Sequence, residues 1–130
     1  MKVLAVDYGL KRVGLASGDT VSRIAFPKGV LIRKNDENLI DDILKICVED
    51  GYKKVVFGLP IDMDGGQGRQ YDLTRNFISV FVDAIKSRKL GLEVEEIDER
   101  LSSFEAEKYS VKKDKIDMMA AKIILERFFS

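Results

Sequence analysis

An apolar run that ends in a carboxylate is the feature that most constrains how this chain folds. Residues 2–7 read KVLAVD, in which four consecutive apolar residues are followed at once by Asp7. An unbroken apolar stretch of this length is typical of a strand buried on both faces of a sheet. A carboxylate at the end of such a strand is costly to desolvate unless it is paired or bound to a metal ion. The run therefore predicts a central strand with a candidate functional residue at its carboxyl end.

The rest of the sequence predicts an α/β fold, with a mixed five-stranded sheet and helices on both faces. Two more strands, at residues 12–18 and about 24–32, are joined by short turns and indicate an antiparallel meander in which Pro27 marks an edge or an irregularity. Helices and strands then alternate, as βα crossovers require. The expected elements are a helix at 37–49, a strand at 53–58, a Gly-rich loop at 59–70, a helix at 71–87, a strand at 92–97, a short helix from Ser102 and a last helix at 115–128.

The composition of the chain excludes several classes of catalytic site. The 130 residues, 45% of them apolar, predict one domain spanning residues 1–130. The absence of histidine excludes Ser-His-Asp, Cys-His and His-ligated zinc sites. The only cysteine, Cys47, is predicted to pack in the core, which fits a reducing compartment. Since the first apolar run is too short for a signal peptide or a membrane span, we expect a cytoplasmic protein with no membrane contact.

Two further acids are candidates for a site shared with Asp7. Glu99 follows the last predicted strand, and ligands collect beyond the carboxyl ends of strands in sheets of this kind. Asp117 lies at the border of the apolar stripe predicted for the last helix. That stripe consists of Ile116, Met119, Ala120, Ile123, Ile124 and Arg127 or Phe128.

Convergence of these three carboxylates would require a cation. Two unit charges 4 Å apart repel each other by about 4 kcal/mol at an effective dielectric constant near 20. Oxygen ligands without histidine or cysteine indicate Mg²⁺ or Mn²⁺, and a paired-metal carboxylate site suits the hydrolysis of a phosphodiester. The spacing leaves open the alternative that Asp7 and Glu99 end their strands as structural acids and that Asp117 is a surface acid.

Glycine and basic residues near these acids are candidates for binding a polyanionic substrate. Gly9 allows a backbone or a substrate to approach closely, and Lys11 and Arg12 follow it across a tight turn. Arg100, next to Glu99, could bind a phosphate through two hydrogen bonds or pair with a nearby acid. Arg69 lies where the Gly-rich loop runs into a helix, which is either an anion site or an ordinary βα loop. The net charge of zero neither supports nor excludes a nucleic-acid partner.

An ordered set of short motifs resembles the YqgF/RuvX family and spans nearly the whole chain. The motifs are Asp7-Tyr8-Gly9, Lys11-Arg12-Val13-Gly14, Gly58-Leu59-Pro60, Met63-Asp64-Gly65, Asp98-Glu99-Arg100-Leu101-Ser102-Ser103 and Lys115-Ile116-Asp117. The resemblance implies a ribonuclease H-like fold with Asp7, Glu99 and Asp117 as its acidic site. Members are described as Holliday junction resolvases and as pre-16S rRNA nucleases. The resemblance therefore implies a nucleic-acid partner, with structured RNA favoured over a DNA junction, and a monomer or homodimer.

One segment departs from the pattern of this family. Residues 109–115 form a brief connection, where many relatives have a longer Gly-rich loop. Basic residues around this connection could replace the loop as phosphate contacts, or they could form a solvated turn. These residues are Lys108, Lys112, Lys113 and Lys115.

Three classes of function remain open. The favoured one is a metal-dependent nuclease that acts in 5′-end processing of pre-16S rRNA during ribosome biogenesis, or on DNA four-way junctions as a two-fold dimer. The second is a non-catalytic nucleic-acid-binding module on the same scaffold, which the retention of all three acids disfavours. The third is an ATP-binding protein of the sugar kinase/actin type, which would need two such domains where 130 residues provide one.

Overall fold

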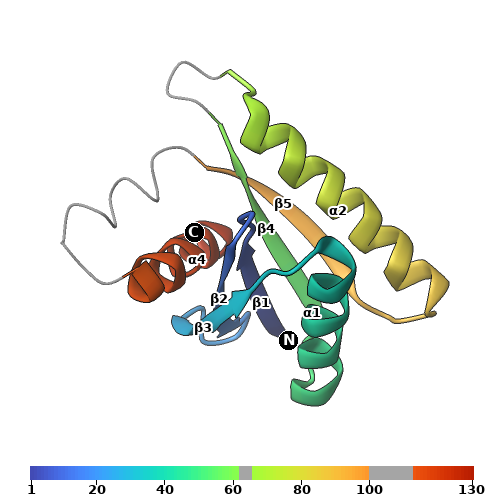
Figure 1. Ribbon diagram of the computed structural model, residues 1–130. Coiled ribbons are helices and arrows are strands. Elements are labelled where there is room, and N and C mark those ends of the chain that lie inside the picture. Colours follow the sequence, from blue (N-terminus) through green and yellow to red (C-terminus); the bar gives the residue numbers. More distant parts are fainter. Residues whose placement is uncertain (62–65, 100–112) are drawn as a thin grey trace.

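The computed structural model describes residues 1–61, 66–99 and 113–130, and in this part the predicted order of strands and helices is confirmed (Figure 1). The strands are β1 (Lys2–Asp7), β2 (Arg12–Asp19), β3 (Ala25–Ile32), β4 (Lys54–Pro60) and β5 (Glu93–Glu99). The helices are α1 (Asp36–Asp50), α2 (Arg69–Ser87) and α4 (Lys113–Phe129). No helix within these ranges is long and apolar enough to cross a membrane. The short helix predicted from Ser102 lies outside the described residues.

The strands form one mixed sheet in the order β3-β2-β1-β4-β5, with the opening apolar run at its centre. β1 pairs antiparallel with β2, and β2 pairs antiparallel with β3, which confirms the predicted meander. β1 and β5 each run parallel to β4, which lies between them. Pro27 lies on the edge strand β3, where the register with β2 shifts between Leu15 and Ala16, as the sequence predicts.

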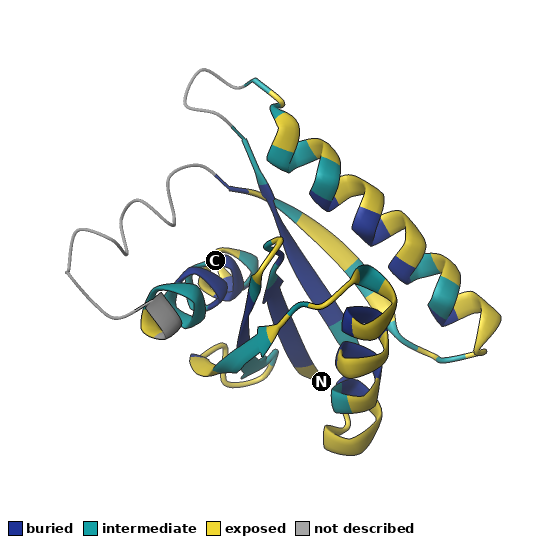
Figure 2. Cartoon of the chain, in the orientation of Figure 1, coloured by how far each residue is buried: buried dark blue, intermediate teal, exposed yellow. Residues whose placement is uncertain are grey.

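Helices cover both faces of the sheet. α1 and α2 cover one face and enclose the larger apolar cluster, in which Cys47 is buried as predicted (Figure 2). α1 begins at an Asn35 cap, whose side chain accepts a hydrogen bond from the backbone N–H of Asn38, and it ends at Gly51 with a φ of 75°. α4 covers the other face, over a smaller cluster that includes Ala5, Ala16 and Ala121. These small residues leave room for α4 to approach the sheet closely.

The buried face of α4 differs from the predicted stripe. Ala120 and Ile124 are buried as expected, but Met119 and Ile123 are only half-buried. The helix is rotated so that the buried face continues through Ala121, Leu125 and Phe129. Because Asp117 precedes Ala121 by four residues, this rotation moves Asp117 from the border of the stripe onto the face that meets the sheet.

Candidate active site

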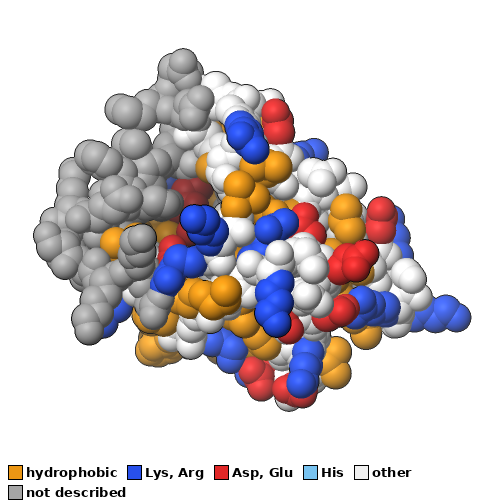
Figure 3. Space-filling model, viewed as in Figure 1, with side chains coloured by type: hydrophobic (Ala, Val, Ile, Leu, Met, Phe, Trp, Pro, Cys, Tyr) orange, Lys and Arg blue, Asp and Glu red, His pale blue; other side chains and the backbone are white. Residues whose placement is uncertain are grey.

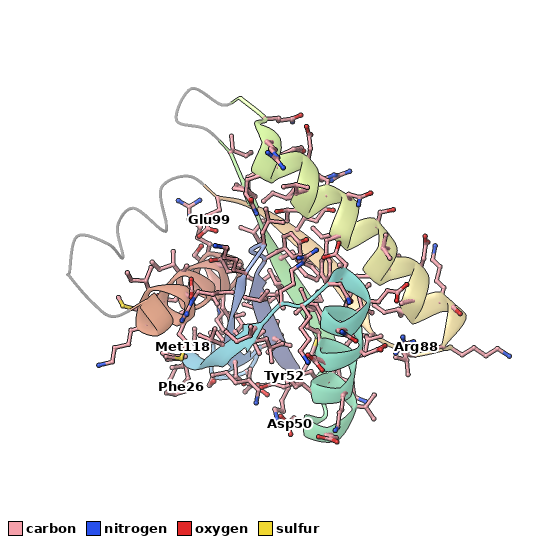
Figure 4. All side chains as sticks on the ribbon, in the orientation of Figure 1. Phe26, Asp50, Tyr52, Arg88, Glu99 and Met118 are labelled. Atoms are coloured by element: carbon pink, nitrogen blue, oxygen red, sulfur yellow. The ribbon has the colours of Figure 1, made fainter. Side chains whose placement is uncertain are left out.

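The three candidate carboxylates come from three elements that meet at one edge of the sheet. Asp7 is the last residue of β1, and Glu99 is the last residue of β5. Because both strands run parallel to β4, their carboxyl ends lie at the same edge. Asp117 lies near the beginning of α4, which packs over this region. Glu99 is 6% exposed and lies where β5 ends, close to the end of β4 (Figure 4).

Two glycines make room for Asp117 and Glu99 on the face of the sheet covered by α4. Gly14 on β2 is the register partner of Asp7, and a Cβ atom at Gly14 would collide with the backbone carbonyl of Asp117. A Cβ atom at Gly58 on β4 would lie 2.7 Å from Oε2 of Glu99 and 2.6 Å from the side chain of Ile124. The missing side chains therefore let α4 and the Glu99 carboxylate approach β1. Both glycines stand in the sequence motifs, but the sequence alone did not indicate what they accommodate.

The electrostatics of Asp7 reflect its burial and its two acidic neighbours. The pKa of Asp7 is raised from 3.8 to about 8, first by burial, then by the charge of Glu99 and then by the charge of Asp117. A divalent cation beside these groups would lower the same pKa, because it favours the ionised carboxylate. Ionisation of Asp7 and binding of a cation are therefore linked.

Arg12 occupies part of this acidic site. Its Nε–H donates a hydrogen bond to Oδ2 of Asp117 over 2.7 Å, and the two side chains are 29% and 23% exposed. Among the residues that the structure describes, no three acidic or cysteine side chains lie close enough together to hold one metal ion. The oxygen ligands are of the type that Mg²⁺ and Mn²⁺ prefer, but one of the three carboxylates is bonded to a guanidinium.

A buried network fixes the turn that follows β1. Tyr8 is 5% exposed, stacks on Phe77 with 4.5 Å between ring centroids, and donates a hydrogen bond from its hydroxyl to Oδ1 of Asp36 over 2.7 Å. Arg33 donates from Nε to the same oxygen over 2.8 Å. Burial and the Asp36 carboxylate raise the pKa of Tyr8 to about 12. Gln70 at the start of α2 donates to the backbone carbonyl of Tyr8 over 3.2 Å.

These supporting residues were missed at the sequence level. Arg33, Asp36 and Gln70 are remote from Tyr8 in the sequence, and only the packing of α1 and α2 against β1 brings them to the turn. No spacing pattern could have linked them to this turn, because Arg33 lies in the connection before α1, Asp36 begins α1 and Gln70 lies in α2.

The predicted substrate contacts are only partly gathered at this edge. Gly9 lies in the turn before β2, where an added Cβ atom would collide with the backbone carbonyl of Arg12. Lys11, Arg69 and Lys115 are exposed, at the turn before β2 and at the starts of α2 and α4. On the face shown in Figure 3, acidic and basic side chains are interspersed. Arg100, Lys112 and the side chain of Lys113 lie outside the described residues.

The sheet order, the helix on each face and the acids at one edge define a ribonuclease H-like α/β protein. Two solved structures share this fold. One is RuvC of Thermus thermophilus in complex with a Holliday junction substrate, with a TM-score of 0.62, 12% identity, and coverage of 99% of this chain and 94% of that one. The other is a Fowlpox virus resolvase in complex with Holliday junction DNA, with a TM-score of 0.53, 12% identity and full coverage of both chains.

The chain belongs to the RuvX family, because the family model described as "RuvX: Holliday junction resolvase" matches residues 1–130. A protein of Maridesulfovibrio salexigens named "Putative pre-16S rRNA nuclease" is 36% identical over 138 aligned positions, covering 100% of this chain and 98% of the relative. A protein of the same name from Alcanivorax borkumensis is 37% identical, covering 98% of this chain and 95% of the relative. Family membership and the ribonuclease H-like fold implied by the sequence motifs are thus confirmed.

Proposed function

We propose that this protein is a metal-dependent nuclease that hydrolyses a phosphodiester bond in the maturation of the 5′ end of pre-16S rRNA. The observation that carries the proposal is the meeting of Asp7, Glu99 and Asp117 at one edge of the sheet, where burial first, and then the charges of Glu99 and Asp117, raise the pKa of Asp7 to about 8. Family membership and the names of its relatives support a nuclease. The names of those relatives favour RNA as the substrate.

In this mechanism the chain provides ligands, phosphate contacts and a rigid frame. Asp7, Glu99 and Asp117 would hold Mg²⁺ or Mn²⁺, which supplies activation of a water molecule and stabilisation of the leaving oxygen when bound. Exposed Lys11 extends from the turn beside Asp7, where it can contact a backbone phosphate. The hydrogen bonds around Tyr8 hold the end of β1 in place, so that the Asp7 carboxylate keeps its direction during the reaction.

Cleavage of DNA four-way junctions is the second candidate. It is favoured by the description of the family and by two neighbours solved with Holliday junctions. Symmetrical cutting of a junction needs a two-fold dimer, whereas cutting at one RNA site does not. A monomer in solution therefore favours the RNA substrate, and a homodimer favours the junction.

The decisive experiment is cleavage of two labelled substrates, a structured pre-16S rRNA fragment and a DNA four-way junction, each with Mg²⁺, Mn²⁺ or a chelator. Wild type is compared with Asp7→Asn and with the matched control Asp83→Asn, which changes an exposed acid on α2. We expect cleavage of the RNA to need metal, to fall at least about a hundredfold in Asp7→Asn, and to stay unchanged in the control. A fully active Asp7→Asn variant would exclude the three-carboxylate site, and binding without cleavage would leave a non-catalytic module.

A further inference from the structure

The ion pair between Arg12 and Asp117 lies inside the candidate metal site. Arg12 comes from the start of β2 and Asp117 from the early part of α4, so the 2.7 Å hydrogen bond joins two elements across the edge of the sheet. The other ion pairs between described residues join acids other than Asp7, Glu99 and Asp117. This pair instead involves Asp117, one of the two carboxylates whose charges act on Asp7.

The guanidinium and a divalent cation would compete for the same carboxylate. A divalent cation binds carboxylate oxygens directly, at about 2.0–2.6 Å. Oδ2 of Asp117 already accepts a charge-assisted hydrogen bond from Arg12, and a guanidinium charge close to the site repels a second cation. Binding of the cation through Oδ2 therefore requires Arg12 to leave this oxygen, and the guanidinium charge opposes a cation at either oxygen of Asp117.

Packing contacts other than this ion pair also hold α4 against the sheet. The backbone of Asp117 packs against Gly14, and Ala121, Ile124 and Leu125 are fully buried against the sheet. The helix is thus anchored by packing over its length, while the ion pair acts at one end. Removal of the guanidinium should change the charge of the site much more than the position of Asp117.

We propose that Arg12 is a counter-cation for Asp117 in the metal-free protein and that it is displaced when a divalent cation binds. The inference rests on the proposed function, because it takes the three carboxylates as the metal site. Arg12 then has two successive roles. It first offsets the charge of Asp117 beside the other two acids, and after its displacement from Asp117 its guanidinium can bind a substrate phosphate beside them.

The test is direct measurement of Mn²⁺ binding by calorimetry, on the full chain without substrate. Arg12→Gln removes the charge and is expected to bind Mn²⁺ about tenfold more tightly than wild type, the factor for loss of one competing charge-assisted bond. Arg88→Gln is the matched control, because Arg88 forms an ion pair with Asp41 and lies at the far end of α2 from Glu99 (Figure 4). We expect its Mn²⁺ affinity to equal that of wild type.

A double variant isolates the pair itself. In an Asp117→Asn background the competition no longer exists, so the addition of Arg12→Gln should change the Mn²⁺ affinity less than twofold. A second readout is the rise in melting temperature that Mn²⁺ produces, which should be larger in Arg12→Gln than in wild type, because the metal-free variant has lost its counter-cation. If Arg12→Gln does not fold, Arg12→Lys replaces it and is expected to bind Mn²⁺ two- to threefold more tightly than wild type, because lysine lacks the guanidinium fork.

The outcomes separate this inference from the proposed function. Equal or weaker Mn²⁺ binding by the Arg12 variant, with metal-dependent cleavage by wild type, overturns the competition and leaves the nuclease intact. Wild type that binds no Mn²⁺ and cleaves neither substrate overturns both. Tighter binding that persists in the Asp117→Asn background also overturns the inference, because the effect of Arg12 would then not act through Asp117.

Discussion

The two faces of the sheet differ in the size of their side chains and in their roles in the protein. The face under α1 and α2 is filled by large side chains, among them Ile43, Phe57, Phe77 and Phe81, all fully buried. The face under α4 presents glycine and alanine at several positions and carries the candidate acids. Large side chains exclude water and stabilise the fold, whereas small ones let a helix and its carboxylate approach the strands. Apart from the hydrogen bonds of Tyr8 that hold the end of β1, the first face therefore provides stability, and the second positions the acids.

The sharpest test of this contrast on the stability side is Ile43→Ala. Ile43 is fully buried in α1, so its truncation leaves a cavity and should lower the free energy of unfolding by roughly 2–5 kcal/mol. Chemical denaturation gives this value. Cleavage per folded molecule, measured well below the melting temperature, should not change. A loss of cleavage larger than the loss of folded protein would show that the two faces are not separable.

Gly14→Ala tests the other face. The new Cβ atom would collide with the backbone of Asp117, so α4 must move, at a cost of roughly 1–3 kcal/mol in the free energy of unfolding. Displacement of Asp117 should lower Mn²⁺ affinity and cleavage well beyond this loss of stability. Gly29→Ala on β3 is the matched control, because nothing lies within 4 Å of its added Cβ atom. A Gly14→Ala variant with the metal affinity of the Gly29→Ala control would refute the positioning role.

The pH dependence of stability in chelator tests the repulsion at Asp7. The pKa of Asp7 is about 8 in the folded protein, above the ordinary value of 3.8. Between pH 3.8 and pH 8 the folded protein therefore keeps a proton on Asp7 that the unfolded protein has lost. Stability from this group is complete below pH 3.8 and is lost as the pH rises through about 8. We expect the free energy of unfolding to decrease by roughly 1–2 kcal/mol between pH 5 and pH 9. This is less than the full pKa shift implies, because Asp7 is only half-buried.

Thermal denaturation across this pH range should show the decrease in wild type and not in Asp7→Asn, and Mg²⁺ should remove it. If the melting temperature falls equally with pH in both proteins, a group other than Asp7 causes the decrease.

The smallest expected effect is at the beginning of α1. The Asn35 side chain caps this helix through the backbone N–H of Asn38, over 2.8 Å, and Asn35→Ala should cost about 1 kcal/mol or less of the free energy of unfolding. Since the cap lies on the stabilising face, Mn²⁺ affinity should stay at the wild-type value in calorimetry. A change in affinity would indicate that loss of the cap also disturbs the hydrogen bond that Tyr8 donates to Asp36 in the first turn of α1, and with it the end of β1.

The sequence determined the elements of this protein and the common edge at which two of its three candidate acids lie. The apolar run at 2–7 made β1 central, and the alternation of helices and strands fixed the parallel strands that follow. Asp7 and Glu99 could be placed at one edge because the carboxyl ends of parallel strands necessarily lie together. Periodicity and strand direction are local properties, which the order of residues records directly.

Only the tertiary structure decided how Asp117 reaches the other two acids. The helical pattern put its apolar stripe one residue away from the face that is actually buried, because a pattern of side chains does not show which face meets small residues on a sheet. Three contacts join elements that are far apart in the sequence. They are the contact of α4 with Gly14, the space for Glu99 at Gly58 and the hydrogen bond from Arg12 to Asp117. Such contacts depend on shape and distance between elements, which the chain acquires only when it packs.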